Sequence, residues 1–479
     1  MSKYDTIIIG AGMSGLAAGI RLAHFGRRVC ILERHTAIGG LNSYYRLEGR
    51  NYDVGLHAVT NYTPKGARRG PLARLLRQLR IRWDDFALVP QLGSKIAFPG
   101  AALHFSNDLE LLRSEVERTF PHEKDAFQRL VDSVVEYDDL SEQTAAVSAR
   151  AVVAEIIHDK LLVEMLFCPL MYYGSAREHD MDFGQFSVMF RSIFLEGFAR
   201  PWAGVRAILK QLVRKFKELG GELRLRAGVG SIELAGQRAC GVVLDDGTQL
   251  EAERVLSSAG LVETMRLCGG AEQELALQAG SISFVEAISV LDRQPREMGC
   301  ERTIVFFNDH EQFDYRRPED LVDVRSGVIC SPNNFAYDEP LAEGLVRTTA
   351  MANYDRWRAL SPEDYCAAKR AWYERIVATA ARHVGDFRPH TVATDMFTPT
   401  TIERFTGHAN GAVYGAPHKR FDGTTPIGNL YLCGTDQGFV GIIGAMFSGI
   451  AMANRHLLPD AADATGPVAS AELAAHDAS

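Results

Sequence analysis

The chain has 479 residues, of which 46% are hydrophobic and 23% are charged, and its formal net charge is -8. That length allows two or three domains with a large core, and the acidic balance gives no reason to expect a nucleic acid as a partner. The eight cysteines are scattered and form no CxxC pair, which favours reduced thiols in a cytoplasmic protein over a disulfide framework or a zinc site.

No part of the sequence predicts a membrane-spanning helix, because no stretch of about 18 uncharged apolar residues occurs. The chain enters its first predicted strand almost at once, so we expect no signal peptide. Residues 459–479 are rich in Ala, Asp and Ser, and this composition predicts a disordered tail.

The first predicted strand, residues 5–9, runs into a glycine-rich turn. Its three consecutive isoleucines predict a strand that is buried on both faces. We expect Gly10 in the tight turn, Gly12 where the backbone approaches a pyrophosphate, and Gly15 where the next helix contacts the strand. That helix covers residues 16–24, and its N-terminus would hold the phosphates because free N–H groups and the helix dipole favour negative charge.

A second apolar run, residues 29–32, ends in Glu33. A carboxylate at the tip of this strand, roughly 20 residues after the glycines, is placed to hold the hydroxyls of a ribose. The order strand, glycines, helix, strand and acid therefore predicts a dinucleotide site. The alternative is a glycine-rich turn in some other α/β protein.

The residues after Glu33 indicate which kind of dinucleotide the site binds, one that contains a flavin or one that contains a nicotinamide. Arg34 is followed by Gly39-Gly40-Leu41 and, further on, by Tyr52-Asp53-Val54-Gly55. Here the sequence resembles the flavin-dependent amine oxidase and phytoene desaturase superfamily, which has a glycine doublet after the ribose acid and a Tyr/Phe-Asp-x-Gly segment beside the isoalloxazine ring. Glycines suit the doublet because only backbone without side chains passes close to a pyrophosphate.

Residues 62–83 interleave basic side chains with leucines, and this pattern predicts an amphipathic helix after a loop. We favour an ordinary domain helix with a solvated basic face. The alternative is contact with a membrane surface, which would suit a lipid substrate.

Residues 161–174 and 183–198 are dense in large apolar and aromatic side chains. Such runs more often form core than a ligand pocket. An apolar tunnel in a second domain is the alternative, since ligand pockets are lined by the same residue types. Tyr173 is a candidate substrate contact on that alternative.

From residue 200 onward the pattern becomes recognisable again. A predicted helix runs to Leu219 and ends at Gly220-Gly221, as αL glycines end helices. Strands follow at residues 222–226 and 229–234, then a hairpin turned by Asp246-Gly247.

This order is similar to the middle of phytoene desaturases, where a Val at the place of Val229 contacts the adenine through its backbone. Those proteins usually have Gly-Gly where this chain has Ala203-Gly204, so the chain departs from the family at this turn. Residues 271–396 contain strand-like pieces and a helical pattern at 362–384. We expect them to complete a substrate domain.

The resemblance sharpens towards the C-terminus. Thr398-Pro399, Arg404-Phe405 and the segment 411–415 look like the carotenoid isomerase and retinol saturase branch. A strand at residues 429–433, a glycine turn with an acid and a new helix then close the pattern.

For this closing segment the expected roles follow the family. Gly434 and Asp436 would contact the ribityl or pyrophosphate chain. Gly441, Ile442 and Ile443 would form a helix N-terminus aimed at the flavin N1/C2 oxygen, where the positive end of the dipole stabilises anionic reduced flavin. A last sheet strand with an ordinary glycine turn is the alternative.

The sequence thus predicts an α/β fold with a Rossmann-type FAD-binding domain, a parallel sheet with helices on both faces plus a β-meander. This domain would combine residues 1–62, 200–270 and 397–458. An α+β substrate-binding domain, inserted discontinuously, would combine residues 63–199 and 271–396.

The resemblance implies an FAD-dependent oxidoreductase that acts on a long apolar polyene or isoprenoid, as carotenoid-type desaturases do. The alternatives are carotenoid cis–trans isomerisation, retinol-type saturation of a double bond, and flavin amine oxidation. A non-enzymatic flavin-holding protein fits poorly with two FAD half-sites.

We assign no catalytic side chain, because a flavin exchanges hydride at its own N5 atom. His57 is a candidate substrate contact near the ring, although a packed or solvent-facing histidine is the favoured interpretation. No HExxH or other ligand spacing predicts a metal site. We make no prediction of oligomeric state.

Overall fold

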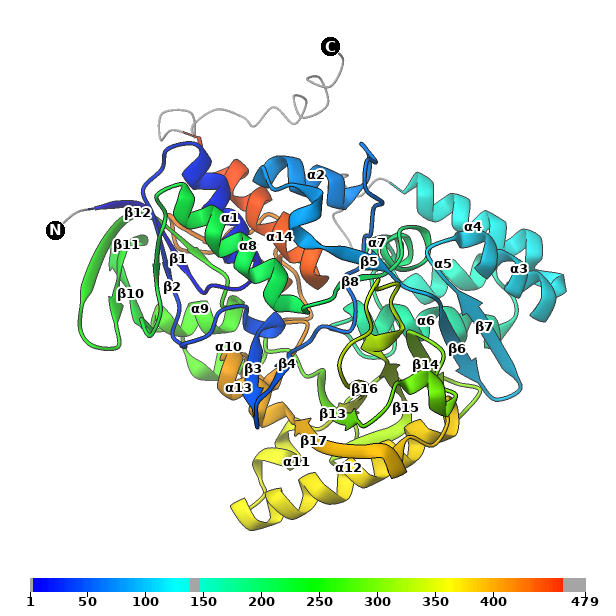
Figure 1. Cartoon of the computed structure of the whole chain (residues 1–479). Helices are drawn as coiled ribbons and strands as arrows, with labels where there is room; N and C mark the ends of the chain where they lie inside the picture. Colours follow the sequence, from blue (N-terminus) through cyan, green and yellow to red (C-terminus); the bar gives the residue numbers. More distant parts are fainter. Residues whose placement is uncertain (1–2, 138–146, 460–479) are drawn as a thin grey trace.

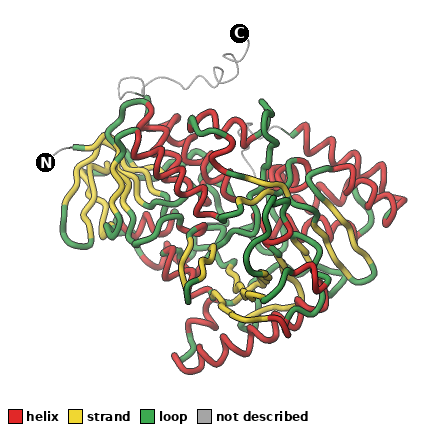
Figure 2. The backbone as a smooth tube through the Cα atoms, viewed as in Figure 1, coloured by secondary structure: helices red, strands yellow, loops and turns green. Residues whose placement is uncertain are grey.

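The computed structural model describes residues 3–137 and 147–459. Their strands form two seven-stranded sheets and two small two-stranded sheets. Figure 1 shows the two large sheets in different parts of the molecule, and Figure 2 shows helices gathered around both. The tail predicted from residue 459 lies outside the described residues from residue 460 onward.

The first sheet joins a parallel sheet to a β-meander, as predicted. Its strands are β1 (Tyr4–Ile9), β2 (Val29–Leu32), β9 (Glu222–Arg224), β10 (Val229–Ala235), β11 (Arg238–Leu244), β12 (Gln249–Ser257) and β18 (Leu430–Leu432). The long strand β12 belongs to both parts. Its first residues pair antiparallel with β11, and later residues pair parallel with β1 and β18.

The predicted apolar strands form the centre of this sheet because both of their faces are covered. Ile7 and Ile8 of β1 are fully buried. Helices cover one face of the sheet, and shorter helices lie near the other (Figure 1). They are α1 (Met13–His24), α2 (Pro71–Leu79), α8 (Val205–Glu218) and α14 (Gly441–Met452), with α9 (Leu261–Leu267) and α10 (Glu272–Ala276).

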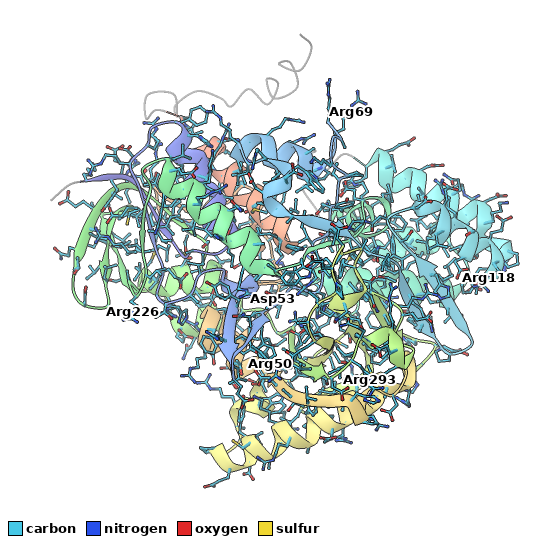
Figure 3. The ribbon with its side chains drawn as sticks, viewed as in Figure 1. Arg50, Asp53, Arg69, Arg118, Arg226 and Arg293 are labelled. Carbon is cyan, nitrogen blue, oxygen red and sulfur yellow. The ribbon has the colours of Figure 1, made fainter. Side chains whose placement is uncertain are left out.

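Helix α2 is the basic amphipathic helix that the sequence predicts. Its leucines, including Leu72 and Leu79, are buried in the core that α1, α8 and α14 share. Its arginines point outward, and Figure 3 shows Arg69 projecting from the loop before it. Since the apolar face already packs against protein, the helix is an ordinary domain helix. Contact of its basic face with a membrane surface stays a prediction.

The second sheet is antiparallel except where β14 runs parallel to β6. Its strand order is β17-β13-β16-β15-β14-β6-β7. The strands are β6 (Ser94–Phe98), β7 (Ala101–Phe105), β13 (Ser283–Leu291), β14 (Ile304–Asn308), β15 (Val322–Cys330), β16 (Gly344–Ala352) and β17 (Thr391–Phe397). Every residue of β13 is buried, because helices cover both faces of the sheet.

One face of the second sheet packs against α12 (Pro362–Val384), which has the predicted bounds. The other packs against the helices that hold the predicted apolar runs. They are α3 (Leu109–Thr119), α4 (Lys124–Glu136), α5 (Ala149–Ile156), α6 (Lys160–Gly174) and α7 (Phe183–Phe190). Most of the apolar and aromatic side chains in these runs are therefore core.

Smaller elements connect the two halves. They are the hairpin β3 (Tyr44–Leu47) and β4 (Arg50–Asp53), the pair β5 (Leu88–Pro90) and β8 (Ala199–Pro201), and the helices α11 (Tyr354–Arg358) and α13 (Pro399–Thr406). No helix in residues 3–137 or 147–459 is both long and apolar enough to cross a membrane. The first large sheet takes its strands from residues 4–32, 222–257 and 430–432, and the second takes its strands from residues 94–105 and 283–397.

Candidate cofactor and substrate site

A cavity of about 530 Å³ is lined by residues of both large sheets. Most of the residues predicted to bind cofactor or substrate lie in its wall, although they come from distant parts of the sequence. They are Gly10, Gly12, Glu33, Arg34, Gly39, Gly40, Leu41, His57, Tyr173, Val229, Gly434, Gly441 and Ile442.

The glycines of the first turn have different surroundings. Gly10 has a φ of +95°, which side chains rarely adopt, and forms the tight turn. A Cβ on Gly15 would lie 2.2 Å from the carbonyl oxygen of Gly10, so this glycine lets α1 pack against the strand end. A Cβ on Gly12 would meet nothing within 4 Å and would project into open space at the start of α1.

The Glu33 carboxylate is fixed beside this turn. The side chain is 7% exposed, and its Oε2 accepts a hydrogen bond of 2.9 Å from the backbone N–H of Ala11. Its Oε1 accepts one of 3.0 Å from the N–H of His35. The acid at the end of β2 is thereby held at the cavity wall, close to the glycine turn.

The glycine doublet after β2 returns to the first turn. Gly39 forms an isolated bridge with Gly12, and its N–H donates a 2.9 Å hydrogen bond to the carbonyl oxygen of Ala11. A Cβ on Gly40 would lie 3.8 Å from the Cα of Gly12. The glycine turn after β1 and the glycine doublet after β2 therefore border the same part of the cavity, and neither puts a side chain into it at Gly12 or Gly40.

The C-terminal segment also reaches this turn. A Cβ on Gly434 would lie 3.2 Å from the Oγ of Ser14, and one on Gly449 would lie 2.0 Å from the carbonyl oxygen of Ser14. Helices α1 and α14 pack closely because Gly449 has no side chain. The first turn of α14 supplies Gly441 and Ile442 to the cavity wall.

Three predicted residues do not line the cavity. Gly15 lies under the turn, where its expected role was helix packing, and Ile443 is 1% exposed in the core around α14. The third is Asp436, whose predicted contact with the cofactor stays a prediction. Its carboxylate is 2% exposed, accepts N–H donors from Leu261 and Ala416, and so links three loops instead of pointing into the cavity.

Asp53, from the Tyr-Asp-x-Gly segment, also has its carboxylate bonded to other protein groups and does not line the cavity. Its Oδ1 accepts a 3.1 Å hydrogen bond from the N–H of Val205, the first residue of α8, and its Oδ2 lies 2.5 Å from Nη2 of the buried Arg200. A Cβ on Gly204 would lie 2.1 Å from that carboxylate. Figure 3 marks Asp53 beside the start of α8.

The end of the cavity at the second sheet is largely apolar and aromatic. Its wall there contains Tyr172, Tyr173, Met189, Phe284, Val328, Val413 and Tyr414. The Tyr173 ring packs against Phe198 and Phe306, with ring centroids 5.6 and 5.2 Å apart. Burial raises the pKa of Tyr173 well above its ordinary value, so the hydroxyl stays neutral.

His57 lies in this end of the cavity as part of a buried polar group. Its Nε2 is 3.1 Å from Glu286 Oε1 and 3.1 Å from Thr349 Oγ1. The same Glu286 oxygen lies 2.6 Å from Nε of Arg347, whose Nη atoms donate to the carbonyl oxygens of Leu56 and Asp53. The His57 ring is thus held by hydrogen bonds on one side and borders the cavity on the other, and its contact with a substrate stays a prediction.

The charge of Glu286 persists in spite of its burial. Burial alone raises the pKa of this carboxyl, but the Arg347 guanidinium and the His57 hydrogen bond outweigh it and lower the pKa to about 2. Glu286 and Thr349 were not among the predicted site residues. A single acid in the apolar strand β13 and a single arginine in β16 were the available signals.

Comparisons with known proteins agree with this geometry. Residues 13–457 match the model of the family described as flavin containing amine oxidoreductase. The chain is 23% identical to the chloroplastic prolycopene isomerase of Daucus carota, over 98% of this chain and 83% of that protein. It is also 23% identical to all-trans-retinol 13,14-reductase of Danio rerio, over 95% of this chain and 86% of that protein.

Solved structures share the fold. An oxidoreductase from Methanosarcina mazei matches with a TM-score of 0.65 and 16% identity, over 94% of this chain and 99% of that one. Putrescine oxidase bound to putrescine matches with a TM-score of 0.62 and 18% identity, over 95% and 98%. Because the family match covers nearly the whole chain, the protein belongs to the flavin containing amine oxidoreductase family and is an FAD-dependent oxidoreductase.

Proposed function

We propose that the cavity holds FAD with its pyrophosphate against Gly12 and Gly40. The open space beside Gly12 supports this position, since an added Cβ would enter it while no protein atom fills it. The Glu33 carboxylate would bind the ribose hydroxyls, and the backbone of Val229 would contact the adenine. The start of α14, at Gly441 and Ile442, would face the flavin ring.

The substrate that we propose is a long apolar polyene or isoprenoid. The observation that carries this proposal is the apolar and aromatic wall at the far end of the FAD cavity, which suits a hydrocarbon chain. The named relatives add support, because they act on prolycopene and retinol. FAD held in the cavity would supply hydride exchange with a carbon atom, and the side chains of the protein would position the substrate and exclude water.

For the reaction we propose desaturation, as in carotenoid-type desaturases. Isomerisation and saturation use the same cavity and differ in the redox state of the flavin and in the fate of the hydride. The three reactions give products of different mass. Desaturation removes two hydrogen atoms, isomerisation leaves the mass unchanged, and saturation adds two hydrogen atoms.

Amine oxidation fits the cavity less well. A free carboxylate would hold a cationic amine, but the Glu286 carboxylate is already paired with Arg347. The C-terminal turn supplies Val440 to the wall, whereas Phe439 does not line the cavity.

One experiment tests the proposal. The purified protein should show the visible flavin spectrum, and incubation with prolycopene, retinol or another polyene should give a product that mass spectrometry and chromatography assign to one of the three reactions. Conversion of polyamines with release of peroxide, with all polyenes returned unchanged, would contradict it. A protein that neither contains nor takes up FAD would contradict the cofactor assignment.

A further inference from the structure

Helix α13 lines one end of the cavity. Ile402, Phe405 and Thr406 of the helix belong to the wall, and so do Gly407 and His408 directly after it. The helix also contacts residues 40–42, which begin with the second glycine of the doublet. The Arg404-Phe405 pair of the sequence motif therefore lies beside the FAD site proposed above.

The end of the cavity at α13 is the end at which Glu33 is fixed. The Phe405 ring lies against the ring of His35, with the two centroids 5.8 Å apart. A Cβ on Gly407 would lie 3.1 Å from Nη1 of Arg34. Both neighbours directly follow Glu33 in the sequence, so α13 ends beside the carboxylate that we assign to the ribose.

The loop before β10 reaches the same end. The N–H of Ala227 donates a 2.8 Å hydrogen bond to the carbonyl oxygen of Glu33. Val229 follows two residues later as the first residue of β10, and both Ala227 and Val229 line the cavity. A base that follows the ribose at Glu33 and contacts Val229 would therefore lie in the part of the cavity that Phe405 also lines.

Both ends of α13 are anchored to other elements. At its start, Thr398 caps the helix, and its Oγ1 lies 2.7 Å from the hydroxyl of Tyr365 on α12. After its end, the N–H of Ala409 donates a 2.7 Å hydrogen bond to Oε1 of Glu263 on α9. The position of the Phe405 ring at the cavity is thus set by the fold on both sides of the helix.

The Phe405 side chain has free surface at this end. The residue is 55% exposed although it belongs to a cavity wall. The His35 ring is tilted by 47° to it, and the guanidinium carbon of Arg404 lies 5.5 Å from its centroid. Exposure of apolar surface to water is unfavourable, so a ligand that covers this ring gains free energy.

We infer that the Phe405 ring packs against the adenine of bound FAD, in addition to the contact proposed for the backbone of Val229. The inference rests on the proposed function, because it assumes FAD in this cavity with its ribose at Glu33. The face of a purine stacks on an aromatic side chain without any hydrogen bond, so a phenylalanine meets the requirement of this position. Since α13 follows β17 directly, the contact would also attach the second sheet to the adenosine half of the cofactor.

The test measures binding of the cofactor and of its adenine half. Flavin-free protein is titrated by calorimetry with FAD and with ADP-ribose, which contains the adenine and the pyrophosphate but no flavin. Phe405→Ala should weaken the binding of both ligands by about ten-fold. Phe405→Trp keeps a flat ring and should bind both as tightly as the wild type, which an altered helix would not explain.

Phe421→Ala is the matched control. Phe421 is 66% exposed, and the cavity wall formed by the described residues does not include it, so neither dissociation constant should change. Fluorescence adds a test of proximity. ADP-ribose should change the emission of the added tryptophan in Phe405→Trp, measured as the difference from the wild type with its four tryptophans, and should leave that of Phe421→Trp unchanged.

Two negative results have different meanings. If Phe405→Ala binds both ligands as tightly as the wild type and ADP-ribose does not change the emission of Phe405→Trp, the inference is wrong while the proposed function stands. If the wild type binds neither FAD nor ADP-ribose, the proposed cofactor site is overturned and the inference with it.

Discussion

Glycines in one motif can serve different purposes, and the structure separates them residue by residue. At Gly12 the space beyond the backbone is open, whereas at Gly15 the backbone of Gly10 occupies it. The same change from glycine to a larger residue should therefore affect cofactor binding at one position and folding at the other.

We predict that Gly12→Val folds but does not retain FAD. Its φ of -74° suits any residue, and the added side chain would fill the space that we assign to the pyrophosphate. Flavin content per chain should fall to near zero, while the thermal midpoint of flavin-stripped protein stays close to the wild-type value. Gly15→Val is the contrast, and should lower that midpoint because its Cβ would overlap the Gly10 carbonyl oxygen.

The buried ion pair of Glu286 and Arg347 provides a second test at the residue scale. Arg347→Met leaves a buried carboxylate without its main partner and should lower the free energy of unfolding by about 3–5 kcal/mol. Urea denaturation measures this loss. Glu286→Gln/Arg347→Met removes both charges and should recover a large part of it, and a double variant as unstable as Arg347→Met would show that lost packing, not the unpaired charge, is the cause.

Glu286 also gives stability a defined pH dependence. Its pKa is lowered from 4.5 to about 2 in the folded protein, so its contribution is fully present above pH 4.5 and is lost as the pH falls towards 2. By linkage the loss amounts to about 3 kcal/mol. Urea midpoints measured across this range should fall more steeply for the wild type than for Glu286→Gln/Arg347→Met, and equal slopes would refute the assignment.

At the scale of elements, Asp53 connects a hairpin to a helix. It ends β4, accepts the first N–H of α8 and lies against Arg200, so it ties three elements together. The departure from the family at Ala203-Gly204 falls at this junction. Gly204 has the positive φ and the close contact, while Ala203 is exposed.

We predict that Gly204→Ala destabilises the protein and that Ala203→Gly does not. The Cβ at position 204 would overlap the Asp53 carboxylate at a φ of +70°, which costs about 1–3 kcal/mol. At position 203 the change should stay within about 1 kcal/mol. Thermal midpoints of the two variants test this prediction. A larger decrease in the midpoint for Ala203→Gly than for Gly204→Ala would mean that position 203 is the constrained one.

At the scale of the whole molecule, the cavity joins the two halves. Ile9 and Leu32 of the first sheet line it together with Val285 and Thr349 of the second. A ligand that fills the cavity would therefore contact both sheets, and its binding energy would stabilise both.

FAD should accordingly protect distant segments together. At a free concentration of about 100 times the dissociation constant, it should add about 2.7 kcal/mol of stability. Hydrogen exchange measured with and without FAD should slow in the turn after β1 and also at the cavity-facing residues of β13 and β16. Gly12→Val should show neither change on addition of FAD, and protection confined to the first sheet would argue against a shared site.

Local signals in the sequence were enough to predict the cofactor half of this protein. The three isoleucines predict a strand, the glycines around Gly12 predict a turn, and Glu33 marks the end of the next strand. Each of these signals acts through short-range sterics and hydrogen bonding. The helix at 362–384 and the hairpin at Asp246-Gly247 were predictable for the same reason.

Only the tertiary structure decided the substrate end. Loops far from Asp436 in the chain supply the N–H groups that engage its carboxylate, and the sequence motif gave no sign of these contacts. Glu286, Thr349 and Arg347 meet His57 because β13 and β16 are neighbours in a sheet and Arg347 bonds back to the chain before His57. Such pairings depend on long-range packing, which leaves no periodic or spaced pattern in the sequence.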